Sequence, residues 1–184
     1  MKRFLLTLAA LIGLVNPVLA ADITHWGKNL FILGELANQD YDKFYEIMAY
    51  HGDEIKDVWI TSIGGSYNDG LLIGTDVKSL GLNTIALGEC YSACAYIWLA
   101  GANRQVFEHN PEDLTFIGIH MPAYVKDPSK PIPQWILRKT EWYLDLLELP
   151  ESAKVEILAT PNEKMLLLGP NRMKSWGLTV TRLE

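Results

Sequence analysis

The sequence is poor in basic residues, in cysteine and in histidine. It contains 16 Lys and Arg against 22 Asp and Glu, with two cysteines and four histidines. Because there is neither a basic run nor a basic amphipathic helix, nucleic acid and anionic lipid are not expected partners. The histidines have no spacing typical of metal ligands, either with one another or with the cysteines, so we expect neither a metal nor a cofactor.

The first twenty residues have the features of a secretory signal peptide. Lys2 and Arg3 precede an apolar core, Phe4–Val15, and a small-residue cleavage pattern ends at Ala20. The core is too short for a membrane span, and no cysteine follows it that could carry a lipid. We therefore expect cleavage after Ala20, a single domain over residues 21–184, a periplasmic or secreted location, and no membrane span in the mature chain. Cleavage changes the net charge from -6 to about -8.

The mature chain alternates short apolar strands with helical stretches, which is typical of an α/β domain. Strands are expected over residues 29–33, 57–61, 83–87, 103–107 and 115–120. Helices are expected over residues 40–51, 66–80, 93–100, 133–149, 151–158 and 170–176. Asp40 is expected to cap the first helix, and glycines at positions 81 and 177 are expected to end two others.

A turn between an apolar strand and an apolar helix contains Ser92. A serine there is most often a structural cap, but it also lies beside unpaired N–H groups that favour a developing anion, as a nucleophile needs. Cys90 and Cys94 flank it. Export permits a disulfide between them, and packing as two small apolar residues is the alternative.

Two further segments carry chemistry. Gly64 and Gly65 follow a strand and precede a helix, where glycine permits positive φ and close approach of the backbone to a ligand. His120 ends an apolar strand. Its neutral imidazole could act as a general base toward Ser92, or it could pair with backbone or water in a structural role.

The helix expected over residues 133–149 has two apolar sides. One contains Ile136, Tyr143 and Leu147, and the other contains Trp135 and Trp142. A core helix is the favoured interpretation. An oligomer interface is the alternative, because aromatic residues are enriched at interfaces.

Four motifs, in order, resemble the ClpP/crotonase superfamily, and in particular the catalytic subunit of the Clp protease. They are the glycine segment Ile60–Ser66, the serine turn Gly88–Ala93 with Gly101 and Arg104 after it, the histidine segment Ile119–Pro122, and the ending Gly169–Leu178. The resemblance covers about residues 29–180, and four ordered motifs are more specific than any one.

The resemblance implies a repeated ββα superhelix and a serine peptidase site. Ser92 would be the nucleophile and His120 the general base, while Gly64, Gly65 and Ala93 would surround the oxyanion. A peptide or protein would be the substrate, and a homo-oligomer is expected. No docking segment for an ATP-dependent partner is evident.

The resemblance also implies an Asp as the third member of a Ser-His-Asp triad, and here the chain departs from the family's pattern. The stretch that matches the family's Asp, residues 160–165, contains no Asp. Glu163 is the best substitute, because its carboxylate can orient and stabilise an imidazolium, whereas Asn162 could only orient it. A Ser-Lys dyad through Lys126 or Lys164 has no motif support.

The sequence therefore predicts an exported ClpP-like serine hydrolase, most simply a peptidase that forms an acyl-enzyme on Ser92. The alternative is a noncatalytic ClpP-fold binding or scaffold protein in the periplasm, because a fold does not determine function. Crotonase-type acyl-CoA chemistry is weaker, since CoA substrates are not expected outside the cytoplasm.

Overall fold

The computed structural model describes residues 20–107, 116–123 and 130–183, so the expected signal peptide lies almost wholly outside it. Within these ranges eight strands form one mixed sheet. The strands are β1 (Asp22–Trp26), β2 (Asn29–Leu33), β3 (Asp57–Ser62), β4 (Asn83–Tyr91), β5 (Arg104–Phe107), β6 (Ile117–Ile119), β7 (Leu166–Leu167) and β8 (Val180–Leu183). The helices are α1 (Asp40–His51), α2 (Tyr67–Ser79), α3 (Ala93–Leu99), α4 (Gln134–Leu146), α5 (Glu151–Leu158) and α6 (Pro170–Ser175).

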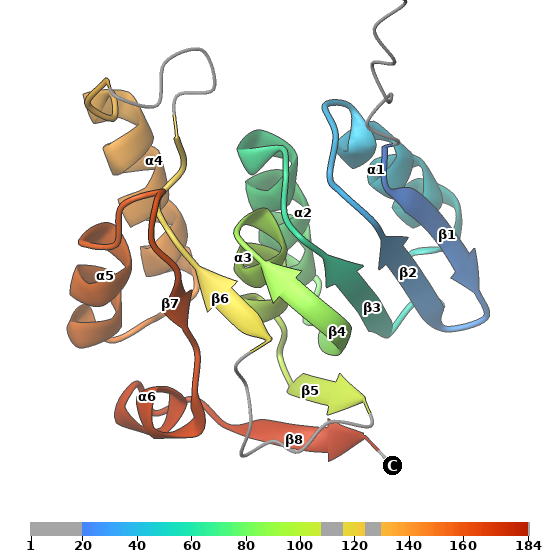
Figure 1. Ribbon diagram of the computed structural model, residues 1–184. Helices are drawn as coiled ribbons and strands as arrows, with labels where there is room; N and C mark the ends of the chain where they lie inside the picture. The colour runs from blue at the N-terminus through green and yellow to red at the C-terminus, as the bar shows by residue number, and fades with distance from the viewer. Residues whose placement is uncertain (1–19, 108–115, 124–129, 184) are drawn as a thin grey trace, which may run out of the picture.

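Strand β4 is the centre of the sheet. The order is β1-β2-β3-β4-β5-β8, with β6 pairing both β4 and β7. Neighbours are parallel except in the β1–β2 hairpin and the β6–β7 pair. The first half of β4 pairs with β5 and its last two residues pair with β6, so the sheet divides into two branches at this strand (Figure 1).

Helices α1, α2 and α3 lie on one face of the sheet (Figure 1). Every residue of α3 is buried, which makes this short helix the middle of the core. On β2, Leu30 and Ile32 are fully buried, and the residues that alternate with them are only partly covered. Across the described part of the chain, no helix is both long enough and apolar enough to span a membrane.

Most elements agree with the sequence predictions. The bounds of the strand at 29–33 and of the helices at 40–51 and 151–158 are confirmed. The hairpin strand β1, the two-residue β7 and the edge strand β8 were not predicted, because short strands with polar residues carry little periodic signal. Strand β4 extends four residues beyond the predicted end, to Tyr91.

The prediction that Asp40 caps α1 is wrong. Asp40 is the first helical residue and is fully buried, and the capping position belongs to Gln39, whose side chain makes no capping hydrogen bond. The Asp40 carboxylate instead accepts hydrogen bonds from Ala21 N at 3.1 Å and Ala37 N at 2.7 Å. Its other oxygen pairs with Lys43 Nζ at 2.8 Å. Asp40 thus joins the start of the described chain to the segment that follows β2.

Helix α4 buries one of its two apolar sides. Ile136, Tyr143 and Leu147 are buried, which confirms the core interpretation for that side. The other side is only partly exposed: Trp135 is 58% exposed and Trp142 is 54% exposed, whereas Leu149, which the sequence places on the same side, is buried. Interface formation by this second side stays a prediction.

Close packing of α2 against α4 predicts that Gly74→Ala is destabilising. A Cβ at Gly74 would lie 1.9 Å from Tyr143 Oη, which is buried and donates to Tyr96 O. Relieving this clash requires Tyr143 to move, at a cost of about 1–3 kcal/mol in the free energy of unfolding. Urea denaturation measures the loss. Gly169→Ala is the matched control, because a Cβ there meets no atom within 4 Å. Equal losses in the two variants would contradict the packing.

Candidate active site

Ser92 has a backbone conformation that is rare for a residue other than glycine. It has φ 55° and ψ -119° at the junction of β4 and α3. Such a conformation costs of order 1–3 kcal/mol and persists only when the surroundings impose it. Here Ser92 N donates to Gly118 O at 2.8 Å, and Ser92 O accepts from Ala95 N at 3.0 Å.

The Ser92 side chain is not a helix cap. It occupies the capping position of α3 but makes no capping hydrogen bond, so the capping role considered from sequence is wrong. Within the described ranges, Ser92 Oγ has no hydrogen-bonding partner at all. A half-buried hydroxyl in a strained turn is therefore left available for a ligand or for chemistry.

Gly64 and Gly65 approach other backbones so closely that a side chain would not fit at either position. Their φ values are 106° and 120°. A Cβ on Gly64 would lie 2.7 Å from Ser92 Cβ, and a Cβ on Gly65 would lie 2.1 Å from Leu36 O. Both glycines are required sterically, and Gly64 packs directly against Ser92.

Two of the three predicted oxyanion donors have free N–H groups. The Gly64 N–H donates to Ser62 Oγ at 3.0 Å, so it is already occupied. The N–H groups of Gly65 and Ala93 donate to no residue that the structure describes. Ala93 is the first residue of α3, where a backbone N–H has no acceptor within the helix. Ala93 directly follows Ser92, and Gly65 lines the same cleft as Ser92, so these two N–H groups are candidates for an oxyanion site.

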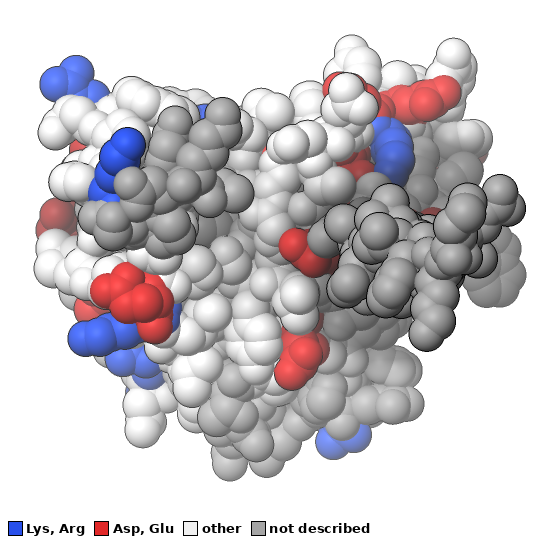
Figure 2. All heavy atoms as spheres, turned by 45° about the horizontal axis from the view of Figure 1, so that its top comes forward, with Lys and Arg blue, Asp and Glu red and all other residues white. Residues whose placement is uncertain are grey.

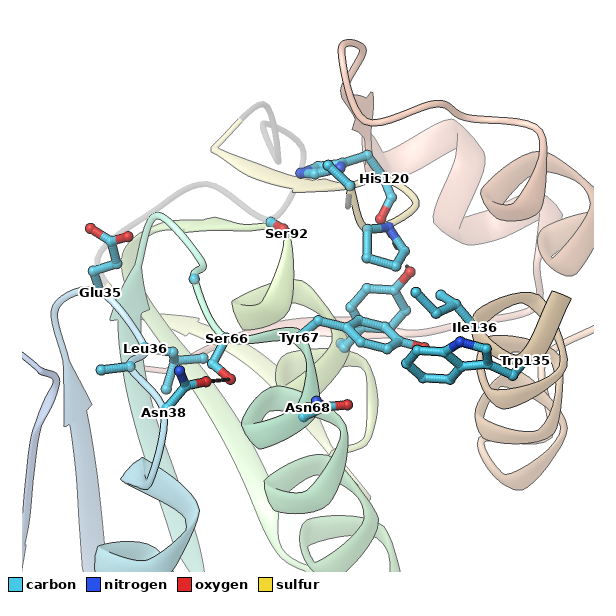
Figure 3. Close-up of a pocket in the computed structure, with 15 residues that line it drawn as sticks. Glu35, Leu36, Asn38, Ser66, Tyr67, Asn68, Ser92, His120, Trp135 and Ile136 are labelled. Carbon is cyan, nitrogen blue, oxygen red and sulfur yellow. Dashed lines mark hydrogen bonds between the residues drawn. The ribbon is translucent and has the colours of Figure 1, made fainter. Parts of the chain in front are cut away.

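His120 lies after β6 and faces the same cleft as Ser92 (Figure 3). Its Nδ1 lies 2.7 Å from Met121 O. Because a carbonyl only accepts, Nδ1 is the donor, and in the neutral ring Nε2 is left as the basic nitrogen. Among the described residues, the Ser92 hydroxyl and the His120 ring are not hydrogen-bonded to each other.

Tyr96 holds His120 through the backbone. Its hydroxyl donates to His120 O at 3.1 Å, and Tyr143 Oη donates in turn to Tyr96 O at 2.7 Å. Burial raises the pKa of both tyrosines above their ordinary value, so both hydroxyls stay protonated as donors. The sequence analysis missed Tyr96. Its position four residues after Ser92, on the same side of α3, is the signal that identifies it.

Glu163 is exposed, and within the described residues it makes no hydrogen bond or ion pair. It lies in a turn closed by a hydrogen bond from Lys164 N to Pro161 O at 3.0 Å. A backbone hydrogen bond from Met121 N to Thr160 O, at 2.9 Å, brings this stretch beside the histidine segment. The triad role of Glu163, or of Asn162, stays a prediction. Lys164 is exposed, and Lys126 lies outside the described residues.

Ser92 and His120 line a cleft of about 700 Å³. Its walls come from the segment after β2, the start of α2, the Ser92 turn, the segment after β6 and the start of α4. Trp135 and Ile136 form the wall on the α4 side (Figure 3). Among the residues that Figure 2 shows as described, most are uncharged, and the charged ones are scattered rather than gathered in one patch. The cleft is of a size and lining typical of small-ligand and peptide sites.

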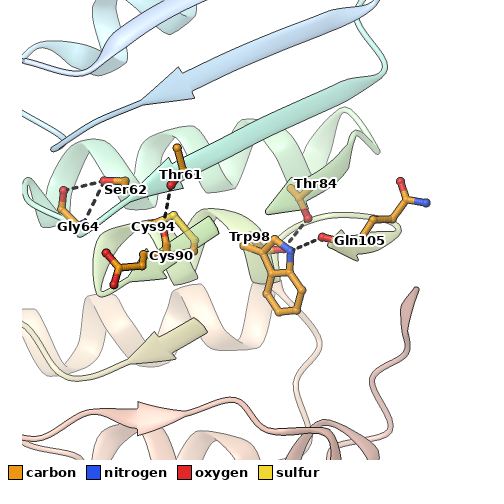
Figure 4. Close-up of a disulfide and its surroundings, with 9 residues drawn as sticks. Thr61, Ser62, Gly64, Thr84, Cys90, Cys94, Trp98 and Gln105 are labelled. Atoms are coloured by element: carbon orange, nitrogen blue, oxygen red, sulfur yellow. Dashed lines mark hydrogen bonds between the residues drawn. A yellow bond between two sulfur atoms is a disulfide. The ribbon is translucent and has the colours of Figure 1, made fainter. Parts of the chain in front are cut away.

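Cys90 and Cys94 form a disulfide, which settles the choice between pairing and simple packing (Figure 4). Both residues are fully buried and their Cα atoms are 5.1 Å apart. The disulfide closes a short loop that contains Ser92, so it limits the conformations open to the serine turn.

The other histidines lie apart from the cleft. His25 and His51 stack with ring centroids 3.9 Å apart, and His109 lies outside the described residues. Where side chains are described, no three His, Cys, Asp or Glu residues are grouped so that they could hold a metal ion. The imidazole chemistry of the cleft therefore depends on His120.

By sequence, the chain matches no protein-family model and no curated protein. By structure, it is similar to a ClpP1 mutant from Listeria monocytogenes, with a TM-score of 0.61 and 19% identity over 85% of this chain and 91% of that chain. It is also similar to the ClpP protease catalytic domain from Plasmodium falciparum, with a TM-score of 0.56 and 18% identity over 85% of each chain. A third similar structure is a mutant of the membrane-bound stomatin-specific protease 1510-N. Its TM-score is 0.56, with 15% identity over 82% of this chain and 76% of that chain. The chain therefore has a ClpP-like fold, as the motifs predicted.

Removal of the disulfide is expected to destabilise the protein. A disulfide stabilises a protein by reducing the conformational entropy of the unfolded chain, and the gain is small for a short loop. The double variant Cys90→Ala, Cys94→Ala is therefore expected to lower the free energy of unfolding by about 2 kcal/mol. Urea denaturation of the double variant measures it. The control is wild type in dithiothreitol, which loses the same constraint without any substitution. A variant as stable as the oxidised wild type would contradict this expectation.

Proposed function

From a ClpP-like fold with a strained serine and a histidine in one cleft, we propose that the protein is a serine hydrolase, and specifically a peptidase. The observation that carries the proposal is the conformation of Ser92, which has φ 55° and an Oγ without a partner among the described residues. A structural serine gains nothing from such a turn, whereas a nucleophile gains exposure to a substrate beside free N–H groups.

In this mechanism Ser92 Oγ attacks the carbonyl carbon of the substrate while His120 Nε2 accepts the hydroxyl proton. The N–H groups of Gly65 and Ala93 stabilise the negative charge that develops on the carbonyl oxygen. The imidazolium then protonates the leaving amine, which departs and leaves an acyl-enzyme on Ser92. A water activated by the same imidazole hydrolyses this ester.

The orientation of the imidazole rests on Met121 O in this proposal. The hydrogen bond from Nδ1 to Met121 O, at 2.7 Å, selects the tautomer that a general base requires. A neutral carbonyl stabilises an imidazolium less than a carboxylate does, so we expect slower acylation than in a Ser-His-Asp enzyme. In this proposal the ring must also move to bring Nε2 to Ser92 Oγ, because catalytic hydrogen bonds often form only when substrate binds.

We propose the location and the assembly of the protein from its sequence and from the exposed residues of α4. The N-terminal segment supports export to the periplasm or beyond, and a disulfide beside Ser92 is consistent with an oxidising compartment. A homo-oligomer is proposed, with the exposed Trp142 on α4 as a contact. Ser92 chemistry uses no metal or cofactor in this proposal.

A second candidate is a noncatalytic binding protein. Its support is the disulfide that closes the serine turn, together with an imidazole whose Nδ1 bonds a carbonyl instead of a carboxylate. A cleft of about 700 Å³ would then capture peptides without cleaving them. The two candidates differ in whether Ser92 reacts.

Reaction with a fluorophosphonate probe distinguishes them. We expect wild type to be labelled at Ser92, because the probe needs a serine activated by a base and an oxyanion site. Ser92→Ala is expected to abolish labelling, and His120→Ala to slow it by about 100-fold or more. In-gel fluorescence with mass spectrometry of the adduct measures both. Absence of labelling in wild type across a range of pH would favour the binding protein.

Glu163→Gln, in the same assay, tests the third member of the site. With Met121 O orienting the imidazole, the labelling rate is expected to stay within about threefold of wild type. A loss of about tenfold or more would instead assign Glu163 the triad role predicted from sequence. Glu46→Gln is the matched control, since it removes one exposed carboxylate on α1 that, like Glu163, makes no hydrogen bond or ion pair among the described residues and lies away from the cleft.

A further inference from the structure

Among the described residues that line the cleft, Glu35 carries the one carboxylate. The lining residues that the structure describes include no Lys or Arg. Glu35 is half-buried, and among the described residues it makes no hydrogen bond or ion pair. A carboxylate in a cleft wall without a cationic neighbour attracts a cation from a ligand.

The backbone on both sides of Glu35 is fixed beside the serine turn. Gly34 N donates to Thr61 O at 3.0 Å, and Leu36 N donates to Gly64 O at 2.7 Å. Gly64 itself packs against Ser92. Figure 3 shows Glu35 on one side of Ser92, with Trp135 and Ile136 on the other. The backbone of Glu35 is thus held at a defined place beside the serine turn, and its carboxylate lies on the wall of the same cleft.

We propose that Glu35 forms a subsite for a basic side chain, Lys or Arg, of the peptide substrate. Trp135 on the opposite side binds an apolar side chain of the same peptide, because its exposed ring offers a large flat surface. This subsite rests on the proposed peptidase function. The subsite makes cationic peptides bind more tightly than acidic ones, in keeping with the negative net charge of the chain.

Peptide binding to the Ser92→Ala variant tests the subsite separately from catalysis. A set of fluorescent peptides of one length carries a single Lys, Gln or Glu at each position in turn, and anisotropy gives each Kd. At one position we expect Lys to bind about fivefold tighter than Gln, the value of a partly exposed ion pair. Adding Glu35→Gln should remove this preference. Glu46→Gln, on the exposed side of α1, is the charge-matched control and should leave it intact.

Each outcome has a distinct meaning. Peptides that bind without a Lys preference, or with a preference that survives Glu35→Gln, overturn the subsite and leave the peptidase proposal standing. Loss of fluorophosphonate labelling in wild type overturns the peptidase, while a Lys preference in Ser92→Ala would still support Glu35 as a binding residue.

A second inference comes from a different part of the molecule, the buried contact between Ala21 and Asp40. Ala21 is 2% exposed, and its N lies 3.1 Å from Asp40 Oδ2, whereas Ala20 is exposed. The cleavage predicted from sequence falls between Ala20 and Ala21. Hydrolysis of that bond adds one water, leaving a carboxylate on Ala20 and a new amino group at Ala21 N.

We infer that cleavage converts this contact into an ion pair between the α-ammonium of Ala21 and the carboxylate of Asp40. At neutral pH a free α-amino group is mostly protonated, and a charge-assisted hydrogen bond is about twice as strong as a neutral one. The same Oδ2 accepts from Ala37 N at 2.7 Å, and Ala37 lines the cleft beside Glu35. Lys43 neutralises the other oxygen. Processing therefore tightens the segment that forms one wall of the cleft.

Comparison of two N-termini on the exported protein tests this ion pair. The full chain is exported from a bacterial host, and mass spectrometry of the product is expected to give Ala21 as the first residue. A second preparation that retains Ala20 before Ala21 should unfold roughly 3–6 °C lower. In the Asp40→Asn background, the difference in unfolding midpoint between the two N-termini should shrink to about 1 °C or less. Asp42→Asn, which changes an exposed residue of α1, is the control and should leave the difference unchanged.

The N-terminal comparison alone decides the matter if Asp40→Asn does not fold. Equal midpoints for the chains that begin at Ala20 and at Ala21 overturn the ion pair. A first residue other than Ala21 in the exported protein overturns it as well, because the ammonium would then lie elsewhere.

Discussion

The contact of the Gly64 backbone with the turn at Ser92 is the constraint on which the cleft depends. Gly64 lies so close to Ser92 that a Cβ would meet the serine side chain at 2.7 Å. Its carbonyl also accepts from Leu36 N, which fixes the segment after β2. The parallel strands β2, β3 and β4 end side by side, so these contacts gather at one edge of the sheet. The strained turn at Ser92 and the backbone of Glu35 lie on either side of this approach, and among the described residues the N–H of Gly65 beside it has no acceptor.

Local chemistry explains why much of this edge could be predicted from sequence. Paired glycines between a strand and a helix, and a serine between an apolar strand and an apolar helix, each signal a sharp turn within a few residues. The ordered motifs extended these local signals to a ClpP-like fold. The pairing of Cys90 with Cys94 needed the turn geometry to bring the two Cα atoms within reach, which spacing alone left open.

The features that could not be predicted depend on contacts between distant segments. Asp is a residue type that commonly caps helices, yet Asp40 is buried and its carboxylate accepts hydrogen bonds from Ala21 N and Ala37 N instead. The support of His120 by Tyr96 joins residues 24 positions apart. Neither contact leaves a periodic trace in the sequence, because each involves one polar group in an otherwise apolar segment.

The division of the sheet at β4 determines how Ser92 and His120 are held relative to each other. Ser92 continues directly from β4, whereas His120 continues from the β6–β7 branch, which pairs with β4 through only two residue pairs. Hydrogen bonds tie the two branches together across this narrow seam, because Ser92 N donates to Gly118 O of β6 and Tyr96 Oη on α3 donates to His120 O. The backbone positions of Ser92 and His120 are therefore coupled, and a change in the separation of the hydroxyl and the imidazole has to come mainly from rotation of the two side chains.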